Sequence, residues 1–163
     1  MRQLINGSIA GLIATVPMSA TMAALHGKLP KEEQYSLPPL EITVAVANGV
    51  GAHEVTDGEE EREAATWVSH FGYGAATGAI YGTIADSTPL SPLAGGVLWG
   101  LVVWSGSYLG WLPLAGLRAP ATRQPPRREA LMIAAHVVFG AATGLIYEAL
   151  RRAERRGSRT RLR

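Results

Sequence analysis

Two histidines occupy equivalent positions in a motif that occurs twice. Residues 70–81 and residues 136–147 both follow His-x-x-aromatic-Gly-Ala-Ala-Thr-Gly-x-Ile-Tyr, so nine of twelve positions share a residue or an aromatic ring. An imidazole can ligate a metal or haem iron, and it can carry a proton near neutral pH. The duplication therefore predicts that His70 and His136 act as a pair, each supplied by one of two equivalent segments.

Several uses of these histidines are consistent with the motif. Both could form hydrogen bonds between helices, they could be the axial ligands of a b-type haem, or they could sense protons. A metal site built from His26 and His53 with the acidic residues of the first loop has suitable ligand types, but no recognisable ligand spacing. The cofactor is therefore open, with haem b as one candidate.

Known catalytic signatures do not occur in the sequence. It contains no His-Glu-x-x-His, no Gly-x-Ser-x-Gly and no phosphate-binding glycine loop before a lysine. We assign no catalytic residue and expect a protein that is not an enzyme.

Four apolar stretches must position the histidines, at residues 4–25, 64–85, 92–112 and 130–150. The first three contain no Asp, Glu, Lys or Arg, and the fourth contains only Glu148. Each reaches the ~20 residues needed to cross the hydrocarbon core of a bilayer. The expected fold is all-α, a polytopic membrane protein with four transmembrane helices in one domain over residues 1–150. The absence of cysteine excludes disulfides and thiolate metal ligands.

Glycines spaced by four residues indicate how these helices pack. Small residues at this spacing allow helix backbones to approach closely within a membrane. The first and third stretches each contain Gly-x-x-x-Gly-Leu, so we expect two parallel two-helix repeats related by a pseudo-two-fold axis along the membrane normal. The expected packing glycines are Gly7, Gly11, Gly74, Gly78, Gly96, Gly100, Gly140 and Gly144.

The segments outside the apolar stretches have their own signals. Residues 38–51 are mildly apolar and too short to span, so we expect an interfacial helix there. Residues 151–163 form a basic tail with seven arginines. Beside a membrane helix, such a tail binds anionic lipid headgroups more often than nucleic acid. The expected headgroup contacts are Arg151, Arg152, Arg155 and Arg156, with both termini in the cytoplasm.

The order of these motifs resembles that of the YagU-like inner-membrane proteins. The resemblance rests on a glycine-rich first helix, the Leu37-Pro-Pro loop, His70, a third helix ending in Trp-Leu-Pro-x-x-Gly-Leu, and His136. It implies a small multi-pass protein of the bacterial inner membrane, and it implies no established enzymatic activity.

We therefore expect an accessory, scaffolding or interaction subunit of a bacterial membrane assembly. Its partners would be the lipid bilayer and other membrane subunits or further copies of the chain, with no nucleic acid. The alternative is an electron-transfer subunit that binds haem b or a metal through its paired histidines. A third hypothesis is a small transporter or channel.

Overall fold

The computed structural model describes residues 1–160, with the side chains of all of these except residues 53, 55 and 157–160. Within this part of the chain all regular structure is helical. The α-helices are α1 (Arg2–His26), α2 (Pro38–Gly49), α3 (Glu59–Ile84), α4 (Pro92–Ser105), α5 (Leu112–Leu114) and α6 (Pro126–Thr160). The π-helical segment η4 (Gly106–Trp111) joins α4 to α5.

The helix starts follow from local sequence. The Ser91 side chain accepts a hydrogen bond of 3.2 Å from the backbone N–H of Ala94 and so caps α4. Pro92 then occupies the first turn, where its missing N–H costs nothing. Pro38 begins α2 in the same way, and three glutamates open α3, where the helix dipole favours negative charge.

Three helical regions among the described residues are long and apolar enough to cross a membrane. They are Arg2–His26, Pro92–Leu114 and Pro126–Arg156. The sequence predicted four such spans, and the remaining one, residues 64–85, lies in α3. That helix has 26 residues, but its histidine, tyrosines, threonines and glycines lower its mean hydropathy. The length and composition of the three spans are those of a membrane protein.

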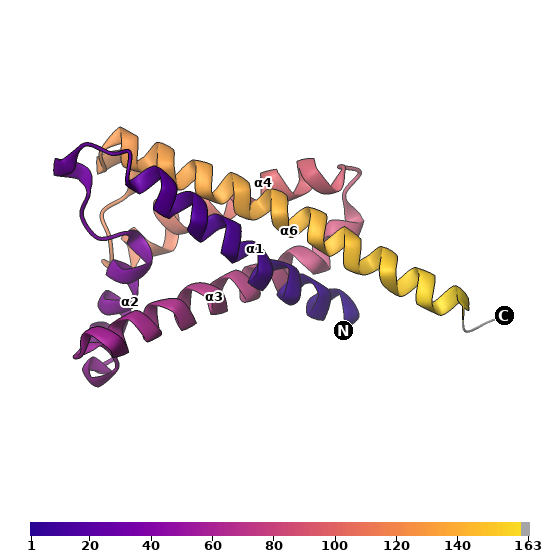
Figure 1. The fold of residues 1–163 in the computed structure, drawn as a ribbon, viewed down its shortest axis with the longest axis horizontal. Coiled ribbons are helices and arrows are strands. Elements are labelled where there is room, and N and C mark those ends of the chain that lie inside the picture. Colours follow the sequence, from indigo (N-terminus) through magenta and orange to yellow (C-terminus); the bar gives the residue numbers. More distant parts are fainter. Residues whose placement is uncertain (161–163) are drawn as a thin grey trace.

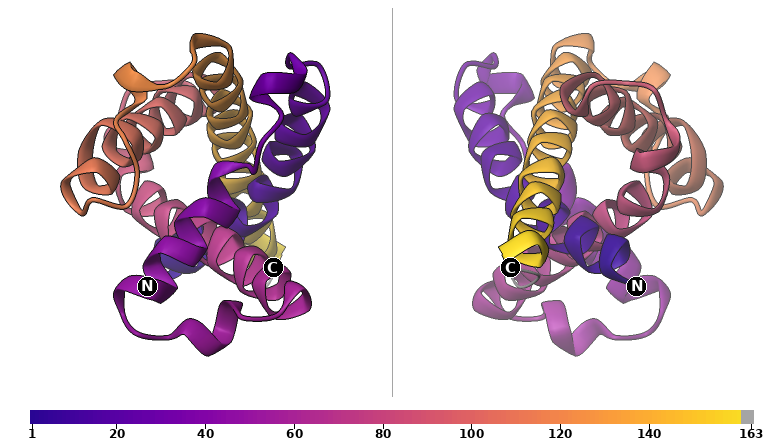
Figure 2. Two further views of the ribbon diagram at one scale, coloured as in Figure 1. Left: turned by 90° about the vertical axis from the view of Figure 1, so that its left-hand side faces the viewer. Right: turned by 90° about the vertical axis from the view of Figure 1, so that its right-hand side faces the viewer.

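The long helices are arranged in the spatial order α3, α1, α6, α4. Helix α1 packs against α3 and α6, and α6 packs against α4. Figure 1 shows α1 and α3 crossing and then diverging toward the end of the bundle that carries α2, while both termini lie at the opposite end. Figure 2 gives the view along the bundle from each end.

The crossing of α1 and α3 brings glycine against glycine. A Cβ atom added to Gly11 would lie 2.8 Å from the Cα atom of Gly78, and one added to Gly7 would overlap the carbonyl oxygen of Gly78. One turn earlier in α3, a Cβ atom at Gly74 would overlap the hydroxyl of Thr15. The two backbones are therefore in contact, and no side chain fits between them.

The crossing of α4 and α6 is built in the same way. A Cβ atom at Gly140 would lie 2.8 Å from the Cα atom of Gly100 and would overlap the carbonyl oxygen of Gly96. A Cβ atom at Gly144 would overlap the carbonyl oxygen of Pro92. Both helix pairs thus depend on the same kind of backbone contact.

The two crossings match with a specific register. Gly78 faces Gly11 as Gly144 faces Gly96, so the contacts make Gly11 the counterpart of Gly96. The sequence comparison had aligned Gly96 with Gly7, one helical turn away. In the register of the structure Gly7 is the counterpart of Pro92 and Thr15 is that of Gly100, so only one glycine of each pair is matched. Only the partner helix selects the register.

We predict that alanine is tolerated in α3 at one glycine and not at another. Gly78→Ala should lower the free energy of unfolding by about 1–3 kcal/mol, because the added methyl group must separate two touching backbones. Gly72→Ala is the matched control, since no described atom lies within 4 Å of a Cβ atom there. Alanine in the helix should leave stability unchanged or raise it by about 0.5–1 kcal/mol. Thermal unfolding of both variants in the same detergent measures the difference, and equal effects would contradict this packing.

Candidate functional site

A cavity of about 770 Å³ lies in the half of the bundle that carries α2. Its walls come from α1, α2, α3, α6 and the segment from α4 to α5, and most of the lining side chains are aliphatic or aromatic. Small-molecule sites typically have volumes of ≈ 300–1,000 Å³, with a few polar groups in an apolar lining. This cavity therefore has the size and character of a ligand site.

Both histidines of the duplicated motif line this cavity. His136 of α6 is 4% exposed, and its Nδ1 atom lies 2.8 Å from the carbonyl oxygen of Met132. A carbonyl oxygen only accepts, so Nδ1 carries the hydrogen and donates it. An apolar surrounding disfavours a charged ring, so the imidazole is neutral. Its Nε2 atom then presents a lone pair.

His70 reaches the same cavity from α3 and is half-buried. The Tyr108 ring stands edge-on to His136 at a centroid distance of 5.7 Å, which restricts how the His136 ring can turn. The two predicted residues are thus brought together, one from each helix pair.

A chain of polar side chains joins α3 to η4 at the cavity. The hydroxyl oxygens of Tyr73 and Ser107 are 2.9 Å apart. The Trp111 indole N–H donates to the Tyr73 hydroxyl oxygen over 3.4 Å. The sequence analysis did not connect these residues, because nothing in the spacing of Tyr73 and Ser107 indicates that they meet.

The rim of the cavity is mostly apolar, with Glu61 and Ser69 as the exposed polar residues of its lining. Several residues line the cavity and are also exposed on the outside, among them Val50 at 73% and Val68 at 74%. Val46, Tyr73 and Trp111 are exposed to a lesser degree at the same rim. A rim of this kind suits contact with lipid better than contact with water.

The other half of the bundle interior is filled by aromatic side chains. Tyr81 and Tyr147, the last residues of the two motif copies, meet edge-to-face with ring centroids 5.7 Å apart. Tyr147 donates its hydroxyl hydrogen to the carbonyl oxygen of Gly82 over 3.0 Å, and Trp99 packs on Tyr81. The sequence carried a signal for this contact in the duplicated tyrosine, and the sequence analysis did not use it.

Helix α2 forms one wall of the cavity and is held at several points. The hydroxyl oxygens of Thr43 in α2 and Ser69 in α3 are 2.6 Å apart. Glu41 forms an ion pair with Arg118, which follows α5. The helix that was predicted to be interfacial is thus held in place by these contacts as a wall of the cavity.

Arg128 secures the segment that leads into α2. Its side chain donates to the carbonyl oxygens of Glu33, Tyr35 and Ser36 over 2.7, 3.0 and 2.7 Å. The guanidinium also lies 3.5 Å from the centroid of the Tyr35 ring, and the residue is 2% exposed. Arg128 was missed from sequence because it looks like one of several loop arginines.

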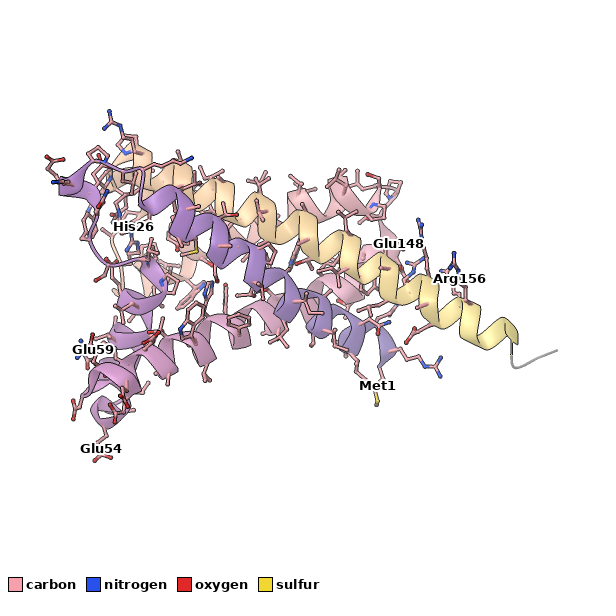
Figure 3. The ribbon with its side chains drawn as sticks, in the orientation of Figure 1. Met1, His26, Glu54, Glu59, Glu148 and Arg156 are labelled. Atoms are coloured by element: carbon pink, nitrogen blue, oxygen red, sulfur yellow. The ribbon has the colours of Figure 1, made fainter. Side chains whose placement is uncertain are left out.

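His26, a predicted metal ligand, lies away from the cavity lining. The His26 Nε2 atom lies 3.1 Å from the Tyr35 carbonyl oxygen, at the bundle end where Glu54 and Glu59 also lie (Figure 3). The side chain of His53 lies outside the described residues. No group of three or more His, Asp or Glu side chains in the described part of the chain could hold a metal ion.

The basic residues at the end of α6 are partly engaged in ion pairs. Arg151 pairs with Asp86 and, over 3.6 Å, with Glu148, while Arg152 pairs with Glu148 over 2.7 Å. Arg155 is exposed. Glu148 and Arg156 lie at the same end as Met1, opposite to His26 (Figure 3).

The fold and the site define a helical membrane protein with a mostly apolar cavity that opens at the surface. Residues 12–145 match the family described as "Protein of unknown function (DUF1440)". The match covers most of the chain, so the protein belongs to this family. No curated protein and no solved structure matched the chain.

We predict that Arg128→Ala loosens the segment before α2. The substitution removes charge-assisted hydrogen bonds to carbonyl groups, each worth about 1.5–3 kcal/mol. The backbone N–H groups of Glu33 and Gln34, which donate to the carbonyl oxygens of Pro30 and Lys31, should exchange hydrogen at least tenfold faster in the variant. Arg127→Ala is the matched control, because Arg127 is exposed and adjacent. Unchanged exchange in Arg128→Ala would show that this residue does not hold the segment.

Proposed function

We propose that this protein is a non-enzymatic accessory subunit of the bacterial inner membrane that binds an apolar small molecule between His70 and His136. The observation that carries the proposal is the 770 Å³ cavity lined by both histidines. The location follows the resemblance to YagU-like proteins and the apolar helices.

The apolar rim supports access from the bilayer. Val50 and Val68 are the most exposed large apolar residues of the lining, and a hydrated solute would have to lose water to pass them. A molecule dissolved in the hydrocarbon phase would not. The ligand we propose is therefore a component of the membrane.

A scaffold would use the small-residue faces of its helices to pack against other subunits. The glycine contacts within the chain argue against that role and favour ligand binding. Gly7, Gly11 and Gly78 face one another within the chain, so these glycines are not available for contact with another subunit. The corresponding glycines of α4 and α6 are occupied in the same way. Other subunits or a second copy would have to contact the exposed aliphatic side chains instead.

We also propose four membrane crossings arranged as two parallel repeats. Helix α3 would be the fourth span. Its 26 residues match the length of α1, and Val68 and Ile80 on its outside are exposed at 74% and 53%. The matching glycine contacts and the meeting of Tyr81 with Tyr147 support the repeat. The arginine tail supports cytoplasmic termini.

A b-type haem is the second candidate ligand. The observation that favours it is that both histidines line one cavity. A ligating histidine normally donates its other ring N–H to a carbonyl or carboxylate, and His136 does so toward Met132. Titration of the purified protein with haem tests this candidate. A low-spin Soret band that disappears in His136→Ala would support it, and free-haem spectra throughout would remove it.

Transport through the bundle has less support. Tyr81, Tyr147 and Trp99 fill the interior between the cavity and the end that carries the termini. A continuous path would require these rings to separate. Binding needs no such movement.

We predict that filling the cavity blocks binding of an apolar probe. Val103 of α4 lines the cavity and is 7% exposed, so Val103→Phe should weaken binding of 1-aminoanthracene at least tenfold. The neighbouring Val102 is 50% exposed on the outside of α4, and Val102→Phe is the matched control. Probe fluorescence in lipid nanodiscs, corrected with empty nanodiscs, measures the affinity. Equal affinity of both variants and the unaltered protein would contradict the proposal.

A further inference from the structure

Building on the proposed function, we infer that the ligand is a membrane phenol or hydroquinone whose ring hydroxyl donates a hydrogen bond to Nε2 of His136. The cavity offers a hydrogen-bond acceptor at His136, so the ligand must supply the donor. A hydroquinone can do so, whereas the quinone of nearly the same shape cannot.

His136 offers an acceptor. Its Nδ1–H is already donated to the Met132 carbonyl oxygen over 2.8 Å, and a neutral imidazole has only one ring hydrogen. A quinone oxygen can only accept, so it finds no hydrogen at His136. A ring hydroxyl can donate to the Nε2 lone pair.

Tyr73 and Ser107 offer a donor. Their hydroxyl oxygens are 2.9 Å apart, and one of the two hydroxyl hydrogens makes the bond between them. The Trp111 N–H donates to Tyr73 and takes no hydrogen in return. One hydroxyl hydrogen of the pair therefore remains for an acceptor in the cavity.

A phenolic hydroxyl both donates and accepts, so it matches these two requirements together. A hydroquinone can use one hydroxyl for each. A quinone satisfies the donor but leaves the buried Nε2 of His136 without a partner. An unpaired buried polar atom costs about 1–3 kcal/mol, so the cavity discriminates between the two forms.

The side chains around His136 suit an aromatic ring. Tyr108 lies edge-on to the imidazole at 5.7 Å, and Phe139, which is 2% exposed, also lines the cavity. The rings of Tyr73 and Trp111, which also line the cavity, lie 6.3 Å apart. Aromatic groups favour offset or edge-to-face contacts at such distances. The apolar rim then leaves room for an aliphatic substituent to extend toward lipid.

The test compares a decyl-substituted benzoquinone with its hydroquinone, under anaerobic conditions, on the full chain in nanodiscs. Displacement of 1-aminoanthracene gives both affinities. The hydroquinone should bind about tenfold more tightly than the quinone. Equal affinities, or tighter binding of the quinone, would overturn the inference without involving any variant.

His136→Phe adds a second comparison. It keeps an aromatic ring of similar size and removes the acceptor, so the affinities of the two forms should become equal while the probe still binds. His26→Phe is the matched control, since His26 lies outside the cavity lining, and it should keep the tenfold ratio. A ratio that persists in His136→Phe would also overturn the inference.

The outcomes separate this inference from the proposal on which it rests. If the probe binds and Val103→Phe blocks it, but the two forms bind equally, the cavity is a ligand site for another chemistry. If Val103→Phe changes the binding of neither the probe nor the quinone and hydroquinone, the proposed function itself fails.

Discussion

The backbone contact between glycines is the constraint on which the rest of the structure depends. Within a membrane the hydrophobic effect does not drive helices together, so close packing must supply the free energy of helix association. Gly11 against Gly78 and Gly96 against Gly140 provide that packing. In each motif copy the histidine precedes the contacting glycines and the tyrosine follows them on the same helix face, because steps of three and four residues stay on one face. The crossings therefore decide where those side chains lie.

Crossing at a narrow contact also explains why the bundle is filled at one end and open at the other. Helices α1 and α3 stay in contact from Gly82 at the Gln3 carbonyl oxygen to Gly74 at Thr15, and they then diverge toward α2, as Figure 1 shows. Near the termini the space is taken by Tyr81, Tyr147 and Trp99. Toward α2 it holds His70 and His136 and remains a cavity. One repeated motif thus supplies the residues of both regions.

Much of this could be predicted from the sequence, and the remainder could not for identifiable reasons. Helical character and the shared face of each histidine, glycine and tyrosine follow from spacing. The register of the crossings does not, because Gly7 and Gly11 are interchangeable until a partner helix is known. The role of α2 as a wall depends on the ion pair between Glu41 and Arg118, which are 77 residues apart. Arg128 binds the carbonyl oxygens of Glu33, Tyr35 and Ser36, and backbone acceptors leave no trace in the sequence.

The chemistry of the cavity is set by helix geometry before any ligand arrives. A side chain on an α-helix leans toward the preceding turn, so the His136 ring lies over the carbonyl group four residues earlier and gives its Nδ1–H to Met132. That local bond leaves Nε2 as the acceptor facing the ligand. The hydroxyl groups of Tyr73 in α3 and Ser107 in η4 supply a hydrogen-bond donor. A mostly apolar cavity with an acceptor at His136 and a donor at Tyr73 and Ser107 would discriminate among the ligands we propose by their hydrogen-bonding groups, because its aliphatic walls accept many shapes but cannot satisfy a polar atom.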